Sequence, residues 1–359
     1  MFYHLLYPLH EQFGALNVFQ YITVRTFMAV FIAMFFSFIF AKPFIRFLQK
    51  KQFWQTIRED GPVQHTIDKR GLPTMGGVLI WSSVYVAMLF CGRLDQVFVQ
   101  IGLLVIFCFA LIGFIDDYRK VILRDAKGLR ARYKFPLQLA VATFTAFLVF
   151  DWVGLSHELT VPFFKLAQFE LGWWYLPFAV CVIVGSSNAV NLTDGLDGLV
   201  SMPSIVAFGA YCFLAYVAGH AVIANYLQVP WVAGSGELAV LCGAVVGAMI
   251  GFLWFNAQPA SIIMGDVGSL PLGALLGYVA VVTKNEILLL GVGGIFVLET
   301  LSVITQVVSF KLTGKRVFRM APIHHHFELK GWPESKVTVR FWIIAIMLAL
   351  ASLATLKLR

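Results

Sequence analysis

Long apolar runs without a charged residue constrain this chain more than any other feature. Two of them read TFMAVFIAMFFSFIF (26–40) and FWIIAIMLALASLATL (341–356). A helix that crosses a bilayer needs about 20 mostly apolar residues, whereas the strands of a membrane barrel are shorter and alternate in polarity. Of the 359 residues, 59% are hydrophobic and 13% are charged, against about 25% charged residues in a soluble domain. The sequence therefore predicts an all-α integral membrane protein.

About ten apolar segments are long enough to be spans, and they form one polytopic domain over residues 1–359. Glycines in GVGGIF (291–296) are expected to loosen the ninth span. An outer segment, 157–174, alternates in polarity and predicts a small β-hairpin. The expected spans cover roughly 22–41, 75–91, 97–115, 135–151, 173–190, 199–218, 237–255, 269–283, 288–310 and 338–356.

Basic residues fall in alternate loops. Segments 42–74 and 116–134 hold seven Lys and Arg residues each and segment 311–337 holds six, whereas the opposite loops between spans hold three. The positive-inside rule places the basic loops in the cytoplasm, and an even number of spans then places both termini in the periplasm. Topology and anionic lipid explain the net charge of +8, so no nucleic-acid partner is predicted.

Ionisable and amide side chains gather at the predicted cytoplasmic ends of the spans. Such groups are costly at a membrane and by default mark function. We expect the cytoplasmic loops near 42–74, 116–134, 191–198, 256–268 and 311–337 to form one active site. The side chains that these motifs supply are Asp116, Asp117, Asn188, Asn191, Asp194, Asp197, Asn256, Asp266, His324, His325 and His326.

These residue types suit phosphoryl transfer. Hard carboxylate oxygens suit Mg²⁺, which usually binds one or two carboxylates together with substrate phosphates, and basic side chains clamp phosphate oxygens. Glycines in PTMGG (73–77), DGLDG (194–198) and MGDVGS (264–269) let the backbone approach an anionic ligand. The sequence has no GxxxxGK[ST] motif. We therefore expect the energy to come from the substrate, by exchange of one phosphoanhydride for another.

Each motif also has a structural interpretation. The aspartates at 116–117 could be a solvated helix end paired with the two cations that follow. Asp194 and Asp197 share a helix face and could form a cap. The histidines at 324–326 resemble a metal tract, but consecutive side chains point in different directions, so we favour hydrogen bonds to phosphate. A transporter would place its polar residues near the bilayer midplane rather than at span ends.

Together the motifs resemble those of a known family. The similarity is to the phospho-N-acetylmuramoyl-pentapeptide transferases (lipid I synthases), within the superfamily of polyprenyl-phosphate N-acetylhexosamine-1-phosphate transferases, and it extends over nearly the whole chain. The triple-histidine loop separates this branch from sibling enzymes that transfer other UDP-sugar phosphates, which stay the alternative. The motifs are PTMGG (73–77), GFIDDYRK (113–120), NAVNLTDGLDGL (188–199), FLWFNAQPA (252–260), MGDVGSL (264–270) and MAPIHHHFELKGWPE (320–334).

The resemblance implies a reaction. UDP-N-acetylmuramoyl-pentapeptide and undecaprenyl phosphate would give lipid I and UMP with Mg²⁺, in the first membrane step of peptidoglycan synthesis. It implies a multi-pass protein of the bacterial cytoplasmic membrane, with the active site on the cytoplasmic face. The implied partners are membrane lipids and a second copy of the chain, with which it would form a homodimer.

It also implies roles for single residues. Asp266 would hold Mg²⁺ on the diphosphate, and Asp116 would lie near the lipid phosphate with Asp117 beside it. A phosphate monoester has a second pKa of about 6, so a base gains little, and Asp116 is expected to position the phosphate at least as much as to remove a proton. A covalent aspartyl intermediate stays open. The catalytic set is Asp116, Asp117, Asp266 and His324; the substrate-binding set is Lys69, Thr74, Lys120, Asn188, Asn191, Asp194, Asp197, Asn256, His325 and His326.

Two positions depart from the family pattern. Ile263 stands where similar proteins often have Phe, a residue expected near the uracil, and Leu72 replaces a common Thr. Neither change removes a charged group, so activity should survive. The changes bear on nucleotide affinity and on sensitivity to nucleoside antibiotics.

Overall fold

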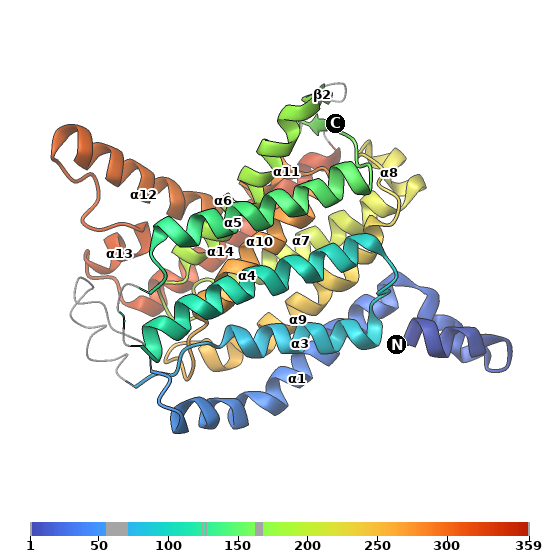
Figure 1. Cartoon of the computed structure of the whole chain (residues 1–359), viewed down its shortest axis with the longest axis horizontal. Coiled ribbons are helices and arrows are strands. Elements are labelled where there is room, and N and C mark those ends of the chain that lie inside the picture. Colours follow the sequence, from blue (N-terminus) through green and yellow to red (C-terminus); the bar gives the residue numbers. More distant parts are fainter. Residues whose placement is uncertain (1, 55–70, 124, 126–127, 162–167, 358–359) are drawn as a thin grey trace.

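The computed structural model describes residues 2–54, 71–123, 125, 128–161 and 168–357. Helices run side by side along the long axis of the molecule (Figure 1). The α-helices are α1 (Ile22–Lys50), α3 (Gly77–Cys91), α4 (Val97–Val121), α5 (Ala131–Phe147), α6 (Tyr175–Thr193), α7 (Ser201–Gly219), α8 (Ala221–Leu227), α9 (Leu238–Asn256), α10 (Asp266–Val282), α11 (Glu286–Val292), α12 (Gly294–Thr313), α13 (Ile323–Glu328) and α14 (Glu334–Ala354).

Short helical turns and two strands complete the fold. The strands β1 (Glu158–Thr160) and β2 (Gln168–Glu170) pair antiparallel, with Leu159 opposite Phe169, so the hairpin predicted over 157–174 is confirmed at these residues. The turns are η1 (Phe2–Leu6), η2 (Tyr7–Glu11), η3 (Gly14–Gln20), η4 (Leu148–Trp152), η5 (Gly172–Trp174), η6 (Ser235–Glu237) and η7 (Thr355–Lys357).

Eight helical segments of the described chain are long and apolar enough to cross a membrane. The second and eighth predicted spans appear as the shorter apolar helices α3 and α10. The ninth predicted span is divided at Gly293 into α11 and α12, as its glycines indicated. The all-α prediction for a multi-pass membrane protein is therefore confirmed, and each of the ten predicted spans corresponds to a helix or, for the ninth, to a helix pair.

Helix α10 lies at the centre of the bundle and packs against α6 and α4. Small residues allow this close packing: a Cβ added to Gly273 would overlap the backbone carbonyl of Ser186 on α6. Close approach through small residues is typical of membrane helices, because lipid supplies no hydrophobic drive for association. This packing holds α4 and α6 against α10.

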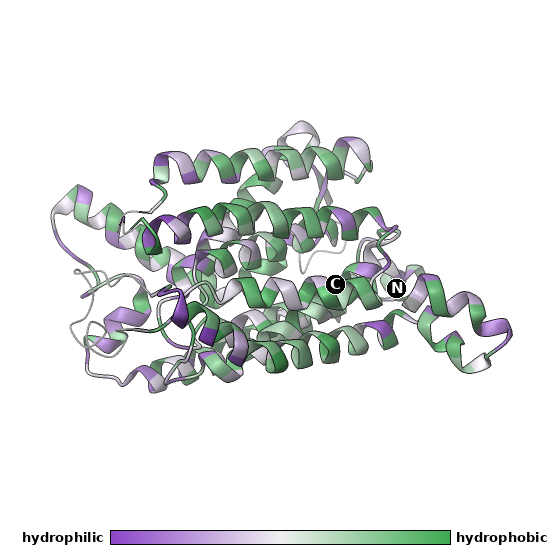
Figure 2. Ribbon diagram, turned by 60° about the horizontal axis from the view of Figure 1, so that its bottom comes forward, coloured by the Kyte–Doolittle hydropathy of each residue, from purple (hydrophilic) through white to green (hydrophobic). Residues whose placement is uncertain are grey.

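The two ends of the bundle differ. The chain termini lie toward one end, while α13 and the C-terminal end of α12 lie toward the other (Figure 1). Figure 2 shows hydrophobic residues along the middle of the helices and hydrophilic residues concentrated at their ends. Helix α12 leans away from the bundle, and its side chains Leu298, Ile304 and Phe310 are exposed. This distribution is expected for helices that are surrounded by lipid along their length.

Candidate active site

Three carboxylates meet where α4 ends and α10 begins. Asp116, Asp117 and Asp266 each offer an oxygen within 4.8 Å of the others. Asp117 and Asp116 are buried, and each accepts a backbone hydrogen bond: Asp117 Oδ2 from Val267 N at 3.0 Å, and Asp116 Oδ1 from Leu129 N at 2.7 Å. The two aspartates are therefore fixed groups of the cluster and not a solvated helix end.

Two lysines neutralise part of this charge. Lys134, from the first turn of α5, places Nζ 2.6 Å from Asp266 Oδ2, and Lys120, one turn after Asp116, places Nζ 3.0 Å from the same oxygen. Lys120 also forms an ion pair with Asp116. Three carboxylates and two ammonium groups have a formal charge of 3 − 2, one negative charge in excess. Asp266 is thus the centre of the charged network.

Asn191 connects α6 to the cluster. Its Nδ2 donates to Asp266 Oδ1 at 2.8 Å and lies 2.8 Å from Ser269 Oγ. Asn188, one turn earlier, instead donates to Gln138 on α5 at 2.9 Å. Of the two predicted asparagines, the structure brings Asn191 to the carboxylates and joins Asn188 to the neighbouring helix.

Thr74 flanks the same site from the loop before α3. A Cβ added to Gly265 would lie 3.0 Å from Thr74 Oγ1 and against Asp117 Oδ2, so all three groups adjoin. Ile263, the position that departs from the family pattern, accepts a backbone hydrogen bond from Gly76 at 2.9 Å. Lys69, another predicted binding residue, lies outside the described residues.

Other predicted residues hold the loops around the cluster. Asp197 Oδ2 accepts from Ala260 N at 3.0 Å, which joins the DGLDG loop to the segment before α10. Asn256 accepts from Gly198 N and donates to Ile262 O, at 3.1 and 2.9 Å. Asp194 follows the last residue of α6 as its C-terminal cap residue. Asp197 and Asn256 therefore brace backbone, and a direct role in binding stays a prediction.

The three histidines lie on α13 and have different hydrogen-bond partners, as predicted for consecutive residues. Each Nδ1 has its own partner: Glu299 Oε1 for His324 at 3.1 Å, Glu328 Oε2 for His325 at 2.7 Å, and the Arg319 N–H for His326 at 3.1 Å. Because Nδ1 of His326 accepts from the Arg319 N–H, a neutral ring carries its proton on Nε2, and His326 cannot ligate a metal without losing this bond. The geometry favours three separate polar contacts.

The carboxylate cluster fits a divalent cation of the Mg²⁺ type. Its donors are all hard oxygens from three side chains, close enough to face one ion, and their formal charge exceeds that of the two lysines. Mg²⁺ binds through a small number of carboxylates with water and phosphate oxygens. The residues that would hold it are Asp266 and the pair Asp116 and Asp117.

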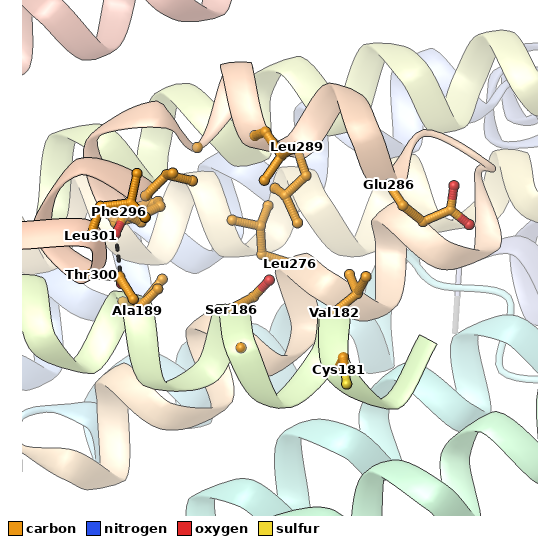
Figure 3. Close-up of a pocket in the computed structure, with 15 residues that line it drawn as sticks. Cys181, Val182, Ser186, Ala189, Leu276, Glu286, Leu289, Phe296, Thr300 and Leu301 are labelled. Atoms are coloured by element: carbon orange, nitrogen blue, oxygen red, sulfur yellow. Dashed lines mark hydrogen bonds between the residues drawn. The ribbon is translucent and has the colours of Figure 1, made fainter. Parts of the chain in front are cut away.

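An apolar groove runs along the side of the bundle between α6, α10, α11 and α12 (Figure 3). Its volume is about 330 Å³. Glu286 lies at one end, and Ala189 and Thr300 lie at the other. Two lining residues on its rim, Leu290 and Leu301, are 61% and 51% exposed, so the groove opens to the side of the bundle, where lipid would surround it. Ala189 lies near the C-terminal end of α6, the same end at which Asn191 contacts Asp266, so this end of the groove is at the level of the carboxylates.

Comparison with known proteins identifies the family. Residues 99–284 match the model of glycosyl transferase family 4. Over the full length of both chains, the sequence is 56% identical to a phospho-N-acetylmuramoyl-pentapeptide-transferase of Thermodesulfovibrio yellowstonii, and 53% identical to proteins of that name from Desulfotalea psychrophila and a Geobacter species. The chain belongs to the phospho-N-acetylmuramoyl-pentapeptide-transferase family. The resemblance of the sequence motifs is thereby confirmed.

The sequence motifs did not identify two charged residues of this transferase, Lys134 and Glu299. Lys134 was one of seven basic residues in its segment, and nothing in the local pattern distinguished it from the others. Glu299 left a clearer signal, since it is an acidic residue inside the apolar run GIFVLETLSVI (294–304). The rule that intramembrane acids mark function would have selected it.

Proposed function

We propose that this chain transfers phospho-N-acetylmuramoyl-pentapeptide from its UDP-linked donor to undecaprenyl phosphate. A phosphate oxygen of the acceptor forms a bond to the sugar-linked phosphorus of the donor. The bond from that phosphorus to the bridging oxygen breaks, and UMP leaves with this oxygen. The products are lipid I and UMP, and one phosphoanhydride replaces another, so no nucleotide hydrolysis is required.

The observation that carries the proposal is the cluster of three carboxylates and two lysines at the ends of α4, α5 and α10. Lys120 and Lys134 are placed to exchange their carboxylate partners for phosphate oxygens of the substrates. Asp116 is held by a backbone N–H and orients the acceptor phosphate beside the donor. Catalysis of this type depends on positioning and on neutralised charge. When bound, Mg²⁺ would neutralise the diphosphate and make UMP a better leaving group.

We propose that the active site faces the cytoplasm. The segments that adjoin it, 116–134 and 311–337, contain thirteen basic residues (seven and six), and such loops remain inside. The UDP-linked donor is a water-soluble cytoplasmic compound, so this orientation gives it direct access. The acceptor is a lipid whose phosphate would lie at the same membrane surface.

The side groove is the proposed site for the part of the polyprenyl chain next to the phosphate. It is apolar, opens toward lipid, and reaches Ala189 and Val190 near the C-terminal end of α6. Gly185 lines the groove, and a Cβ added to it meets nothing within 4 Å. A larger side chain at this position would therefore occupy the groove without disturbing the helices.

Replacement of Gly185 by Phe should raise the KM for undecaprenyl phosphate about tenfold, because the ring takes space from about two chain carbons worth about 0.8 kcal/mol each, and about 1.4 kcal/mol is tenfold. The KM for the UDP-linked donor should not change. Gly209→Phe is the matched control, since Gly209 is an exposed glycine of α7 that also meets nothing within 4 Å and does not line the groove. Equal acceptor KM values in the two variants would exclude this groove as the acceptor site.

The reaction itself is tested by UMP release from purified protein in detergent, with UDP-N-acetylmuramoyl-pentapeptide, undecaprenyl phosphate and Mg²⁺. Release that needs both substrates and yields a lipid-linked product supports the proposal. If UDP-N-acetylglucosamine is consumed instead, the chain is a sibling transferase. Inactivity with every UDP-sugar would contradict phosphoryl transfer.

A further inference from the structure

Glu299 is a buried acid that the proposed mechanism has not used. It lies in the second turn of α12, and both Glu299 and His324 are 0% exposed. Its two oxygens have separate partners: Oε2 accepts from the backbone N–H of Ile323 at 2.9 Å, and Oε1 lies 3.1 Å from His324 Nδ1. A charged side chain inside a helix bundle is costly unless it is hydrogen-bonded. The two hydrogen bonds of Glu299 are therefore what allows this carboxylate to be buried.

The arrangement fixes the proton on the imidazole ring. A carboxylate only accepts hydrogen bonds, and the Ile323 N–H already occupies one oxygen. The other oxygen is therefore satisfied only when Nδ1 of His324 carries a proton. The ring cannot rotate by half a turn without losing this bond, so Nε2 is held in one direction.

Nε2 of His324 is buried and has no hydrogen-bond partner within the part of the chain that the structure describes. It faces Gly195 of the DGLDG loop, where an added Cβ would overlap Nε2 and lie 2.8 Å from Cε1. Four residues earlier, Asn191 donates to Asp266. A buried polar atom without a partner requires an explanation, and this one is directed at the loop that begins beside the carboxylate cluster.

We propose that Glu299 is a positioning residue: it holds His324 with Nδ1 protonated and with Nε2 directed at the DGLDG loop, and when this loop moves off the ring on binding, a diphosphate oxygen of the UDP-linked donor becomes the partner of Nε2. This inference rests on the proposed function. An oxygen of the diphosphate only accepts, so Nε2 must donate to it, and the ring then carries both protons. Glu299 balances the charge of that imidazolium.

Glu299→Gln tests the pairing with little change of volume. The amide has one acceptor oxygen, which the Ile323 N–H requires, so its NH₂ group faces Nδ1 and the proton of a neutral ring moves to Nε2. Nε2 then still donates, but from a neutral ring and not from an imidazolium, and a neutral donor holds a diphosphate oxygen less strongly. We expect kcat/KM for the UDP-linked donor to fall about 10- to 50-fold. A loss of this size is typical when a metal-ligating histidine loses the hydrogen-bond partner of its other ring nitrogen, and we expect the same for a histidine that binds phosphate. The KM for undecaprenyl phosphate should stay unchanged. Ser302→Ala is the control, since Ser302 is a buried residue of the same helix whose hydroxyl donates to the backbone carbonyl of Glu299 and not to its carboxylate.

A second variant acts on the ring from its other side. Gly195→Ala pushes against Nε2 and should lower kcat/KM for the UDP-linked donor in the same way, so the inference stays testable if Glu299→Gln fails to fold. Imidazole ¹⁵N spectra of histidine-labelled protein, assigned with His324→Gln, should show Nδ1 protonated in the wild type and the proton on Nε2 in Glu299→Gln.

These measurements separate the two proposals. If the wild type releases no UMP, the proposed function fails, while the spectra still test the Glu299 pairing. Donor kcat/KM within about twofold of wild type in both variants would overturn the positioning role. So would equal losses for donor and acceptor accompanied by a lower melting temperature, because a role in folding alone does not distinguish the substrates.

Discussion

Replacement of Asp266 by Asn should lower UMP release by about 10³-fold, because the metal and the lysines together contribute several kcal/mol to the transition state and each tenfold in rate is worth about 1.4 kcal/mol. Asp266 accepts from Lys120, Lys134 and Asn191 through its two oxygens. An amide has one oxygen, so it cannot serve both lysines and the asparagine and also hold a divalent cation. The measurement is UMP release at saturating substrates, normalised to folded protein.

The control for this variant is Asp95→Asn. Asp95 is an exposed aspartate in the loop before α4, at the opposite end of that helix, and its carboxylate is paired with Arg93. It should keep its activity. A second readout is the rise in melting temperature on addition of Mg²⁺, which binding to the folded state produces; the wild type should show it and Asp266→Asn should not. Substantial Mg²⁺-dependent turnover in Asp266→Asn would contradict the assignment of Asp266 as the metal ligand.

Replacement of Gly113 by Ala should lower activity by about 10²-fold, the loss that a misplacement of about 1 Å can cause. Gly113 lies one turn before Asp117, and a Cβ there would overlap the carbonyl of Asp266 and approach Val267 N to 2.6 Å. These are backbone atoms that cannot rotate away. Helix α4 must therefore move from α10, which breaks the bond from Val267 N to Asp117.

Gly102→Ala on the same helix is the matched comparison. A Cβ at Gly102 would lie 2.9 Å from Leu241 Cδ2 and 3.2 Å from the Tyr278 ring, which are side-chain atoms. The leucine can adjust its rotamer, so we expect activity within about threefold of wild type, as for modest overpacking. Similar losses in both variants, each parallel to a loss of folded protein, would show that Gly113 serves helix packing and not the alignment of the carboxylates.

The sequence predicted which acidic residues form the site better than it predicted the hydrogen-bond and ion-pair partners of those residues. Asp116, Asp117 and Asp266 were selected because acids at span ends are costly, and the structure brings them together. The partner of each acid depends on how helices far apart in sequence pack, and no local pattern specifies that. Lys134 is an example, since 132 positions separate it from Asp266.

Two other predicted binding residues show the same limit. Asn256 and Asp197 look like ligand-binding groups in the sequence, but in the structure both side chains form hydrogen bonds to the backbone of neighbouring loops. Polar side chains near a site either contact a ligand or satisfy the backbone that shapes it, and the residue type is the same in both cases. Only the hydrogen-bond geometry in the folded protein tells a ligand-contacting side chain from one that satisfies the backbone.

The sideways opening of the groove between α6 and α12 has a kinetic consequence. A lipid acceptor would enter it by diffusion in the plane of the bilayer and would never cross bulk water. The variable that sets saturation is then the mole fraction of acceptor in the surrounding lipid or micelle, and not its molar concentration in the sample. An apparent KM would therefore rise with added detergent at constant acceptor, and values from different detergents are comparable only when expressed as surface fractions.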